Sequence, residues 1–243
     1  GTISCGGALP FLDGVSLKQL VAKCQMSRAV TKEGKANALG EWWLENLKGI
    51  QNGAAITLGT GLGGGVIVEG KLLQGAHFQA GELSFLLNAT KRSDAPENAE
   101  QPHNQGLTLQ QLAGFSGSAV AMIRRSAQLL GLADLADGEA VFDAINQKQP
   151  QVWALFTAYC REIACVMLNV QAVIDLERFV IGGGISAQAI VVEELDRQYQ
   201  QLLASLPLLQ QTLTKPEIQA CTFQNDANLL GALSHFFLEH EMQ

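Results

Sequence analysis

The sequence AAITLGTGLGGGVIVE at residues 54–69 decides the fold class of this chain. The apolar, β-branched run at residues 54–58 predicts a strand, five of the next seven residues are glycine, and residues 66–69 predict a second strand. A tight turn at residues 69–71 then predicts a short third strand at residues 72–73. We therefore expect an antiparallel meander whose first connection is a glycine-rich loop.

Two common nucleotide-binding motifs do not fit this loop. Gly59, Gly61 and Gly64 have the G-x-G-x-x-G spacing, and Glu82 lies near the distance expected for a ribose-binding acid. That motif requires a helix directly after the loop, and a strand is predicted there. A Walker motif requires Lys followed by Ser or Thr, and this loop has neither. What remains is a hairpin whose backbone amides, with the Thr60 hydroxyl, approach a polyphosphate, the alternative being a glycine-rich turn with a packing role only.

Helices and strands alternate through the rest of the chain. Periodicity and apolar runs predict helices at residues 17–24, 35–47, 152–174, 190–206 and 226–239, a helix pair within 107–130 that is interrupted near 114–117, and strands at 179–181 and 217–222. Gly182, Gly183 and Gly184 end the first of these strands and precede a helix. Two glycine sites in one chain can hold the two ends of a nucleotide. The alternation predicts an α/β fold with a mixed sheet.

Composition excludes several classes of protein. The chain has 243 residues, enough for one large domain or two lobes, and its net charge of −7 argues against a nucleic-acid surface. No apolar run is long enough to span a bilayer, so no membrane partner is expected. The five cysteines form no CxxC pair and are expected to be reduced packing residues of a cytoplasmic protein. The four histidines do not cluster with them, so no zinc motif is read here.

Several segments together resemble the ROK family of bacterial sugar kinases and sugar-responsive repressors. The matching segments are 58–65, Ala80-Gly81-Glu82, 180–185 and Gly231-Ala232, and the resemblance runs nearly end to end. Within that family, residues 6–14 resemble the zinc-free branch of β-glucoside and N-acetylmannosamine kinases. The resemblance implies an actin-like ATPase (ribonuclease H-like) α/β fold of two lobes. Residues 1–52 and 227–243 would belong to the small N-terminal lobe, and residues 53–226 would form the large C-terminal lobe.

The resemblance also implies a reaction and its site residues. The γ-phosphoryl group of ATP, with Mg²⁺ neutralising its charge, would pass to a hexose hydroxyl, usually O6. Glu82 would accept hydrogen bonds from sugar hydroxyls. The nucleotide contacts would come from Thr60, Gly61, Gly63, Gly64 and Gly65 for the phosphates and from Gly182, Gly183 and Gly184 for the adenosine. The protein would act on small molecules, and a homodimer is one assembly that the family implies.

This sequence departs from the family pattern at three places. The family's first phosphate loop, Asp-x-Gly-Gly-Thr, falls before Gly1, so we expect the first lobe of the chain as given to be incomplete. The family's Glu-Asn-Asp-Ala-Asn segment falls on residues 31–35, which puts Glu33 in place of the Asp that acts as general base and Lys32 in place of a sugar-binding Asn. The cysteine triplet of zinc-binding members is missing, so no structural zinc is expected.

These departures leave alternatives open. Lys32 either pairs with Glu33 and lowers its basicity, or the two form a solvated charge pair. His77 either lines the sugar site or is an ordinary surface histidine. The competing class of function is a sugar-sensing or regulatory protein, or a kinase remnant, that has lost catalysis. The altered base and the missing first phosphate loop favour this class, whereas the intact second phosphate hairpin favours a kinase.

Overall fold

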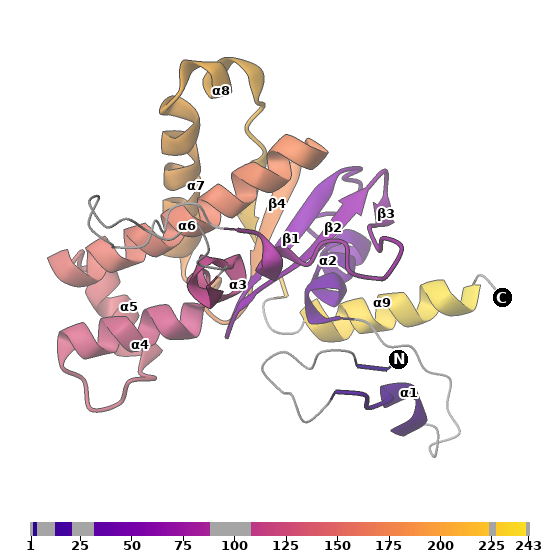
Figure 1. The fold of residues 1–243 in the computed structure, drawn as a ribbon, viewed down its shortest axis with the longest axis horizontal. Helices are drawn as coiled ribbons and strands as arrows, with labels where there is room; N and C mark the ends of the chain where they lie inside the picture. Colours follow the sequence, from indigo (N-terminus) through magenta and orange to yellow (C-terminus); the bar gives the residue numbers. More distant parts are fainter. Residues whose placement is uncertain (1, 4–12, 21–31, 88–107, 224–226, 242–243) are drawn as a thin grey trace, which may run out of the picture.

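The computed structural model describes residues 2–3, 13–20, 32–87, 108–223 and 227–241. Its centre is a five-stranded sheet of order β3-β2-β1-β4-β5 (Figure 1). The strands are β1 (Gly53–Leu58), β2 (Leu62–Val68), β3 (Lys71–Leu72), β4 (Arg178–Gly182) and β5 (Glu217–Ala220). β2 runs antiparallel to β1 and β3, whereas β1, β4 and β5 are mutually parallel. The predicted meander and mixed sheet are confirmed.

Helices cover both faces of this sheet because its central strands are apolar on both sides. Ala55 and Val180 pack on one face in a cluster with Ala38 of α2 (Glu33–Leu44). Ile56 and Ile181 pack on the other face in a large cluster with residues of α6 (Pro150–Ile174) and α7 (Ala189–Ala204). α9 (Ala227–Glu241) lies against α2, on the opposite side of the sheet from α6 and α7 (Figure 1).

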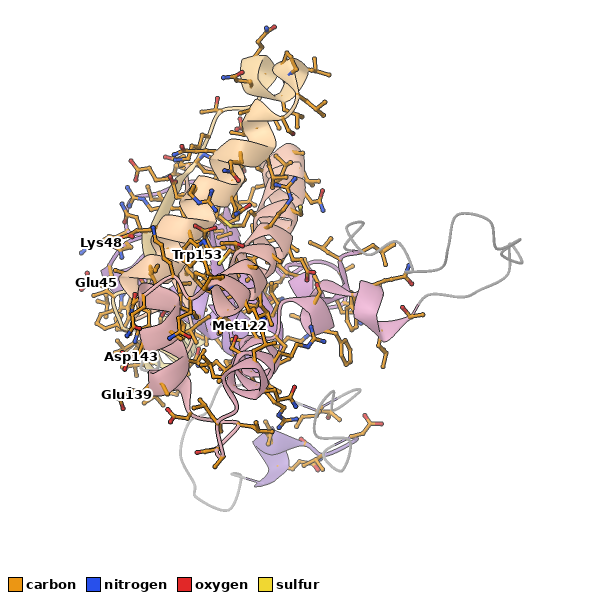
Figure 2. All side chains as sticks on the ribbon, turned by 90° about the vertical axis from the view of Figure 1, so that its left-hand side faces the viewer. Glu45, Lys48, Met122, Glu139, Asp143 and Trp153 are labelled. Atoms are coloured by element: carbon orange, nitrogen blue, oxygen red, sulfur yellow. The ribbon has the colours of Figure 1, made fainter. Side chains whose placement is uncertain are left out.

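A helical subassembly extends from α6. It contains α3 (Ala113–Ser116), α4 (Ala119–Leu130) and α5 (Gly138–Asn146), and α8 (Pro207–Thr212) follows α7. Met122 of α4 is buried among these helices, whereas Glu139 and Asp143 of α5 lie on the outside (Figure 2). The predicted pair of helices is found, but the break lies at residues 117–118 and not across 114–117, which are mostly in α3. Ser118 caps α4 by accepting a hydrogen bond from the Ala121 amide at 3.1 Å.

Some predicted elements have different limits. α5 and α8 were not predicted, because each helix is short. Each begins at a local signal, the Asp137 cap for α5 and Pro207 for α8. α1 (Leu17–Leu20) and the short 3-10 helices η3 (Leu83–Phe85) and η4 (Leu109–Gln111) complete the described elements. The rest of the predicted first helix and all of residues 88–107 lie outside the described residues.

The largest difference between the prediction and the structure lies in the glycine segment. β2 begins at Leu62, so the last three glycines are strand residues that pair with β1, and the prediction that the strand starts at Val66 is wrong. α2 crosses β2 so closely that a Cβ on Gly65 would lie 2.5 Å from the carbonyl oxygen of Gly34. A Cβ on Gly64 would lie 2.5 Å from Leu83. The connection between the strands is therefore short, and Gly64 and Gly65 have a packing role.

The division into lobes stays a prediction. Residues 1–52 were assigned to the small lobe, and α2 within them packs directly on β1 and β2. Gly231 of α9 approaches the same helix so closely that a Cβ there would lie 1.6 Å from the carbonyl oxygen of Ala36. The described part of the first lobe is thus continuous with the sheet through α2.

Candidate active site

The two glycine clusters meet at one edge of the sheet. β1 and β4 are parallel neighbours, so their carboxyl ends lie side by side, and Thr57 pairs with Gly182. Gly183 has φ +96°, and a Cβ there would lie 2.2 Å from the carbonyl oxygen of Leu58. The structure thus brings together the predicted phosphate segment and the predicted adenosine segment, which are more than a hundred positions apart in the sequence.

The hairpin tip between β1 and β2 is held by the following helices. The carbonyl oxygen of Gly59 accepts hydrogen bonds from the amides of Ala119 at 3.0 Å and Val120 at 3.4 Å, in the first turn of α4. A Cβ on Gly61 would lie 3.1 Å from the carbonyl oxygen of Gly114. Thr60, between these fixed glycines, is exposed. The tip therefore presents its hydroxyl and its backbone to solvent from a rigid base.

The same edge has room for a ligand. A Cβ built on Gly59 or on Gly184 would meet nothing within 4 Å, although Gly183 beside it has no space at all. Open space flanked by close-packed backbone and an exposed hydroxyl fits a nucleotide, whose phosphates bind backbone amides and hydroxyl groups. The residues present therefore fit ATP at this edge.

Lys32 and Glu82, both predicted to contact the sugar, are in direct contact. Lys32 precedes the first residue of α2, and its Nζ donates to Oε2 of Glu82 at 3.0 Å. The Ser84 hydroxyl donates to Oε1 of the same carboxylate at 2.6 Å. Burial by itself would raise the pKa of Glu82, but the hydrogen bonds from Ser84 and Lys32 and the charges of Lys32 and Lys35 hold that pKa below its usual value.

Glu33 has a different partner from either alternative considered above. Its Oε1 accepts a hydrogen bond at 3.0 Å from Nδ2 of Asn228, on α9, and Lys32 pairs with Glu82 instead. Glu33 is exposed at the first turn of α2. The prediction that Lys32 would pair with Glu33 is wrong, because the start of α2 directs the two side chains to different neighbours.

Lys35 is a further site residue that the sequence analysis did not single out. It is only 6% exposed, and its Nζ donates to the carbonyl oxygen of Phe78 at 3.0 Å. Burial, and to a lesser degree the charge of Lys32, lowers the pKa of Lys35, and Glu82 opposes this shift. His77 is exposed and adjoins Phe78 in the same loop. Lys35 could have been found from the sequence, because it is the last residue of the segment 31–35 that was aligned with the family motif.

The helix α2 ties this cluster to the glycine edge. Nδ2 of the buried Asn37 donates to the Thr57 hydroxyl at 3.0 Å, one residue before the end of β1. One turn later the buried Glu41 accepts a hydrogen bond from the amide of Thr222 at 2.9 Å, on the way into α9. One helix therefore positions Glu33, the glycine edge and the segment that leads to Asn228.

Among the described residues, His, Cys, Asp and Glu side chains form no group of three or more that is arranged to hold a metal ion. No helix among the same residues has the length and apolar character to cross a membrane.

A mixed sheet of order β3-β2-β1-β4-β5, with glycine segments at the carboxyl ends of β1 and β4, defines the actin-like ATPase class of α/β proteins. The model of the ROK family matches residues 13–237 of this chain. The chain belongs to the ROK family, and the predicted fold and family are confirmed.

Known proteins of this family align over nearly the whole chain. A β-glucoside kinase from Listeria innocua is 28% identical over 98% of this chain and 75% of its own length. A ROK family protein from Streptococcus pneumoniae, solved in complex with sucrose, has a TM-score of 0.77 at 24% identity and covers 100% of this chain and 77% of its own. A ROK glucokinase from Streptomyces griseus, solved with glucose and AMPPNP, has a TM-score of 0.71 at 21% identity over 90% of this chain and 72% of its own.

Proposed function

We propose that this chain is an ATP-dependent sugar kinase that transfers the γ-phosphoryl group to a hydroxyl, O6, of a hexose or hexose derivative. One observation carries the proposal. A single helix, α2, places an exposed carboxylate, Glu33, beside the Lys32–Glu82 cluster and is bonded through Asn37 to the glycine edge. The kinase relatives, one of which was solved with both a sugar and an ATP analogue, support the same assignment.

In this proposal the protein supplies positioning and charge. Glu33 takes the proton from the attacking hydroxyl, and Asn228 fixes its orientation through the 3.0 Å hydrogen bond. Thr60, Gly61 and Gly63 hold the phosphates, and residues 182–184 adjoin the adenosine. Bound Mg²⁺ would offset the charge of the phosphates of ATP. Contacts of Gly64 and Gly65 with phosphate stay a prediction, because both are closely packed, Gly64 against Leu83 and Gly65 against Gly34 of α2.

The second candidate is a sugar-binding regulatory protein with impaired catalysis. Two observations favour it. Both oxygens of Glu82 already have partners, and Glu33 carries one methylene more than the Asp found in the family. A displacement of about 1 Å at a reacting group can cost on the order of 100-fold in rate. The two candidates share a sugar site and differ in turnover.

A coupled assay of phosphoryl transfer separates them. The chain is assayed with ATP and a panel of hexoses, N-acetylhexosamines and β-glucosides, beside Glu33→Gln. We expect turnover in the parent chain and a loss of about 100-fold or more in Glu33→Gln, because a general base contributes roughly 10²–10⁴ in rate. Glu45→Gln, at the opposite end of α2 and exposed, is the matched control and should stay within about twofold.

The results of this assay distinguish the two candidate functions. Equal rates for Glu33→Gln and the parent chain contradict the assignment of the base. Sugar-dependent thermal stabilisation without turnover selects the regulatory candidate. In Glu33→Asp we expect a higher rate, by up to about 100-fold, because the shorter side chain restores the family geometry. An unchanged or lower rate argues against Glu33 as the base.

A further inference from the structure

The carboxylate assigned to the sugar hydroxyls already has a donor on each oxygen. Oε2 of Glu82 is bound by the Lys32 ammonium and Oε1 by the Ser84 hydroxyl, at 3.0 and 2.6 Å. A neutral sugar that takes the place of Lys32 at Glu82 replaces a charge-assisted hydrogen bond with a neutral one, which is roughly half as strong. The displaced ammonium would then have lost its carboxylate.

A second ammonium group lies in the same place. Lys32 directly precedes α2, Lys35 lies in the first turn of that helix, and the charges of both lysines act on Glu82. Lys35 is almost fully buried, and the acceptor it contacts is a neutral carbonyl oxygen, that of Phe78. A buried cation is stabilised far more by an opposite charge than by a carbonyl group. Its lowered pKa is consistent with this shortage of negative charge.

The charge balance of this cluster is positive. Glu82 faces both lysines, and it is the carboxylate whose charge acts on Lys35. The Lys32–Glu82 pair is also easy to exchange. The Lys32 side chain is 53% exposed, and exposed ion pairs of this kind contribute only about 0–1 kcal/mol. A negatively charged ligand can therefore replace Glu82 as the partner of Lys32 at little cost in free energy.

We propose that the sugar taken by this site carries a carboxylate: a sugar acid whose carboxylate pairs with Lys32 and Lys35 and releases Glu82 to accept hydrogen bonds from its hydroxyls. This inference rests on the proposed function, which places the sugar beside Glu82. The carboxylate lies away from the accepting hydroxyl, as in an aldonate, in which C1 is oxidised and O6 is intact.

The test compares sodium gluconate with glucose, two probes that share O6 and most of their hydroxyl pattern. Dissociation constants are measured by calorimetry on the chain without ATP at one ionic strength, with sodium acetate as a control for a bare carboxylate. We expect gluconate to bind at least about 10-fold more tightly than glucose, which is the scale of one well-placed ion pair. Lys32→Asn should remove that preference and strengthen glucose binding, because Glu82 is then free.

Lys48→Asn is the matched control, since Lys48 is an exposed lysine beyond the far end of α2 (Figure 2). It should leave both constants unchanged. If Lys32→Asn lowers the thermal midpoint, Lys32→Gln replaces it in the comparison.

Several results would overturn the inference. These are equal or tighter binding of glucose, a preference for gluconate that survives in Lys32→Asn, and acetate binding as tightly as gluconate. Tighter binding of glucose 1-phosphate than of gluconate would overturn the carboxylate in favour of a phosphate. Phosphoryl transfer to glucose without a preference for gluconate would refute the inference and leave the kinase proposal intact. A preference for gluconate without phosphoryl transfer to either probe would refute the kinase proposal and leave the inference intact.

Discussion

The glycine edge and the first turn of α2 are both parts of the candidate site, and they differ in what fixes them. At the glycine edge the residues are dictated by backbone contacts. Gly183 has no room for a Cβ, and Gly65 lies under the backbone of α2. At the first turn of α2 the residues are held by side-chain pairs, Lys32 with Glu82 and Glu33 with Asn228. We therefore expect substitution at the glycine edge to lower stability and substitution at the first turn of α2 to change ligand binding. The family pattern is accordingly kept at the edge and altered at the helix.

The largest expected effect tests the glycine edge. Gly183→Ala puts a Cβ 2.2 Å from the carbonyl oxygen of Leu58 in a backbone conformation of φ +96°. We expect a loss of about 3–5 kcal/mol in the free energy of unfolding, the sum of backbone strain and a clash with rigid backbone. Denaturant titration of the chain measures it. Gly184→Ala is the adjacent control, and because a Cβ there meets nothing within 4 Å its stability should change by less than about 1 kcal/mol. Equal losses in the two variants would refute the backbone explanation.

A smaller effect separates packing from phosphate binding within β2. In Gly65→Ala the added Cβ lies 2.5 Å from the carbonyl oxygen of Gly34 and 2.7 Å from Cβ of Ala38. We expect a loss of about 2–3 kcal/mol from overpacking between strand and helix. Gly63→Ala places its Cβ 3.6 Å from the nearest atom, an ordinary contact, and should fold with nearly unchanged stability. If Gly63→Ala is as unstable as Gly65→Ala, the close approach of α2 is not what selects glycine here.

The fold could be predicted where local pattern and tertiary packing agree. The long apolar run of α6, the presence of a break before α4 and the strand–glycine–strand order were all predicted from neighbouring residues. The start of β2 was not, because the reason for its glycines is a helix that begins some thirty residues earlier. Within the site, Lys32 and Glu82 came from motif positions. Asn228 could not be found this way, since its bond to Glu33 joins residues 195 positions apart.

The smallest expected effect concerns the charge pair at the first turn of α2. The pKa of Glu82 is lowered in the folded chain, so the ionised form adds stability above the unfolded pKa of about 4.3, and this is lost as the pH falls through the folded value. The free energy of unfolding of the parent chain should exceed that of Glu82→Gln by no more than about 1 kcal/mol at pH 6, because the Lys32 partner is half exposed. This difference should shrink as the pH is lowered to about 3. Urea unfolding of both chains at each pH measures it.

Glu41 supplies the opposite case in the same helix. Burial raises the pKa of Glu41 and outweighs the three backbone amides that bond its carboxylate. The stability linked to this group is therefore present below the unfolded pKa and lost as the pH rises through the folded one. The difference in the free energy of unfolding between the parent chain and Glu41→Gln should narrow as the pH rises. The same difference for Glu82→Gln should widen. Parallel trends for the two variants would mean that burial, and not pairing with Lys32, also dominates at Glu82. The Lys32–Glu82 contact would then be too weak to set the ligand preference of the site.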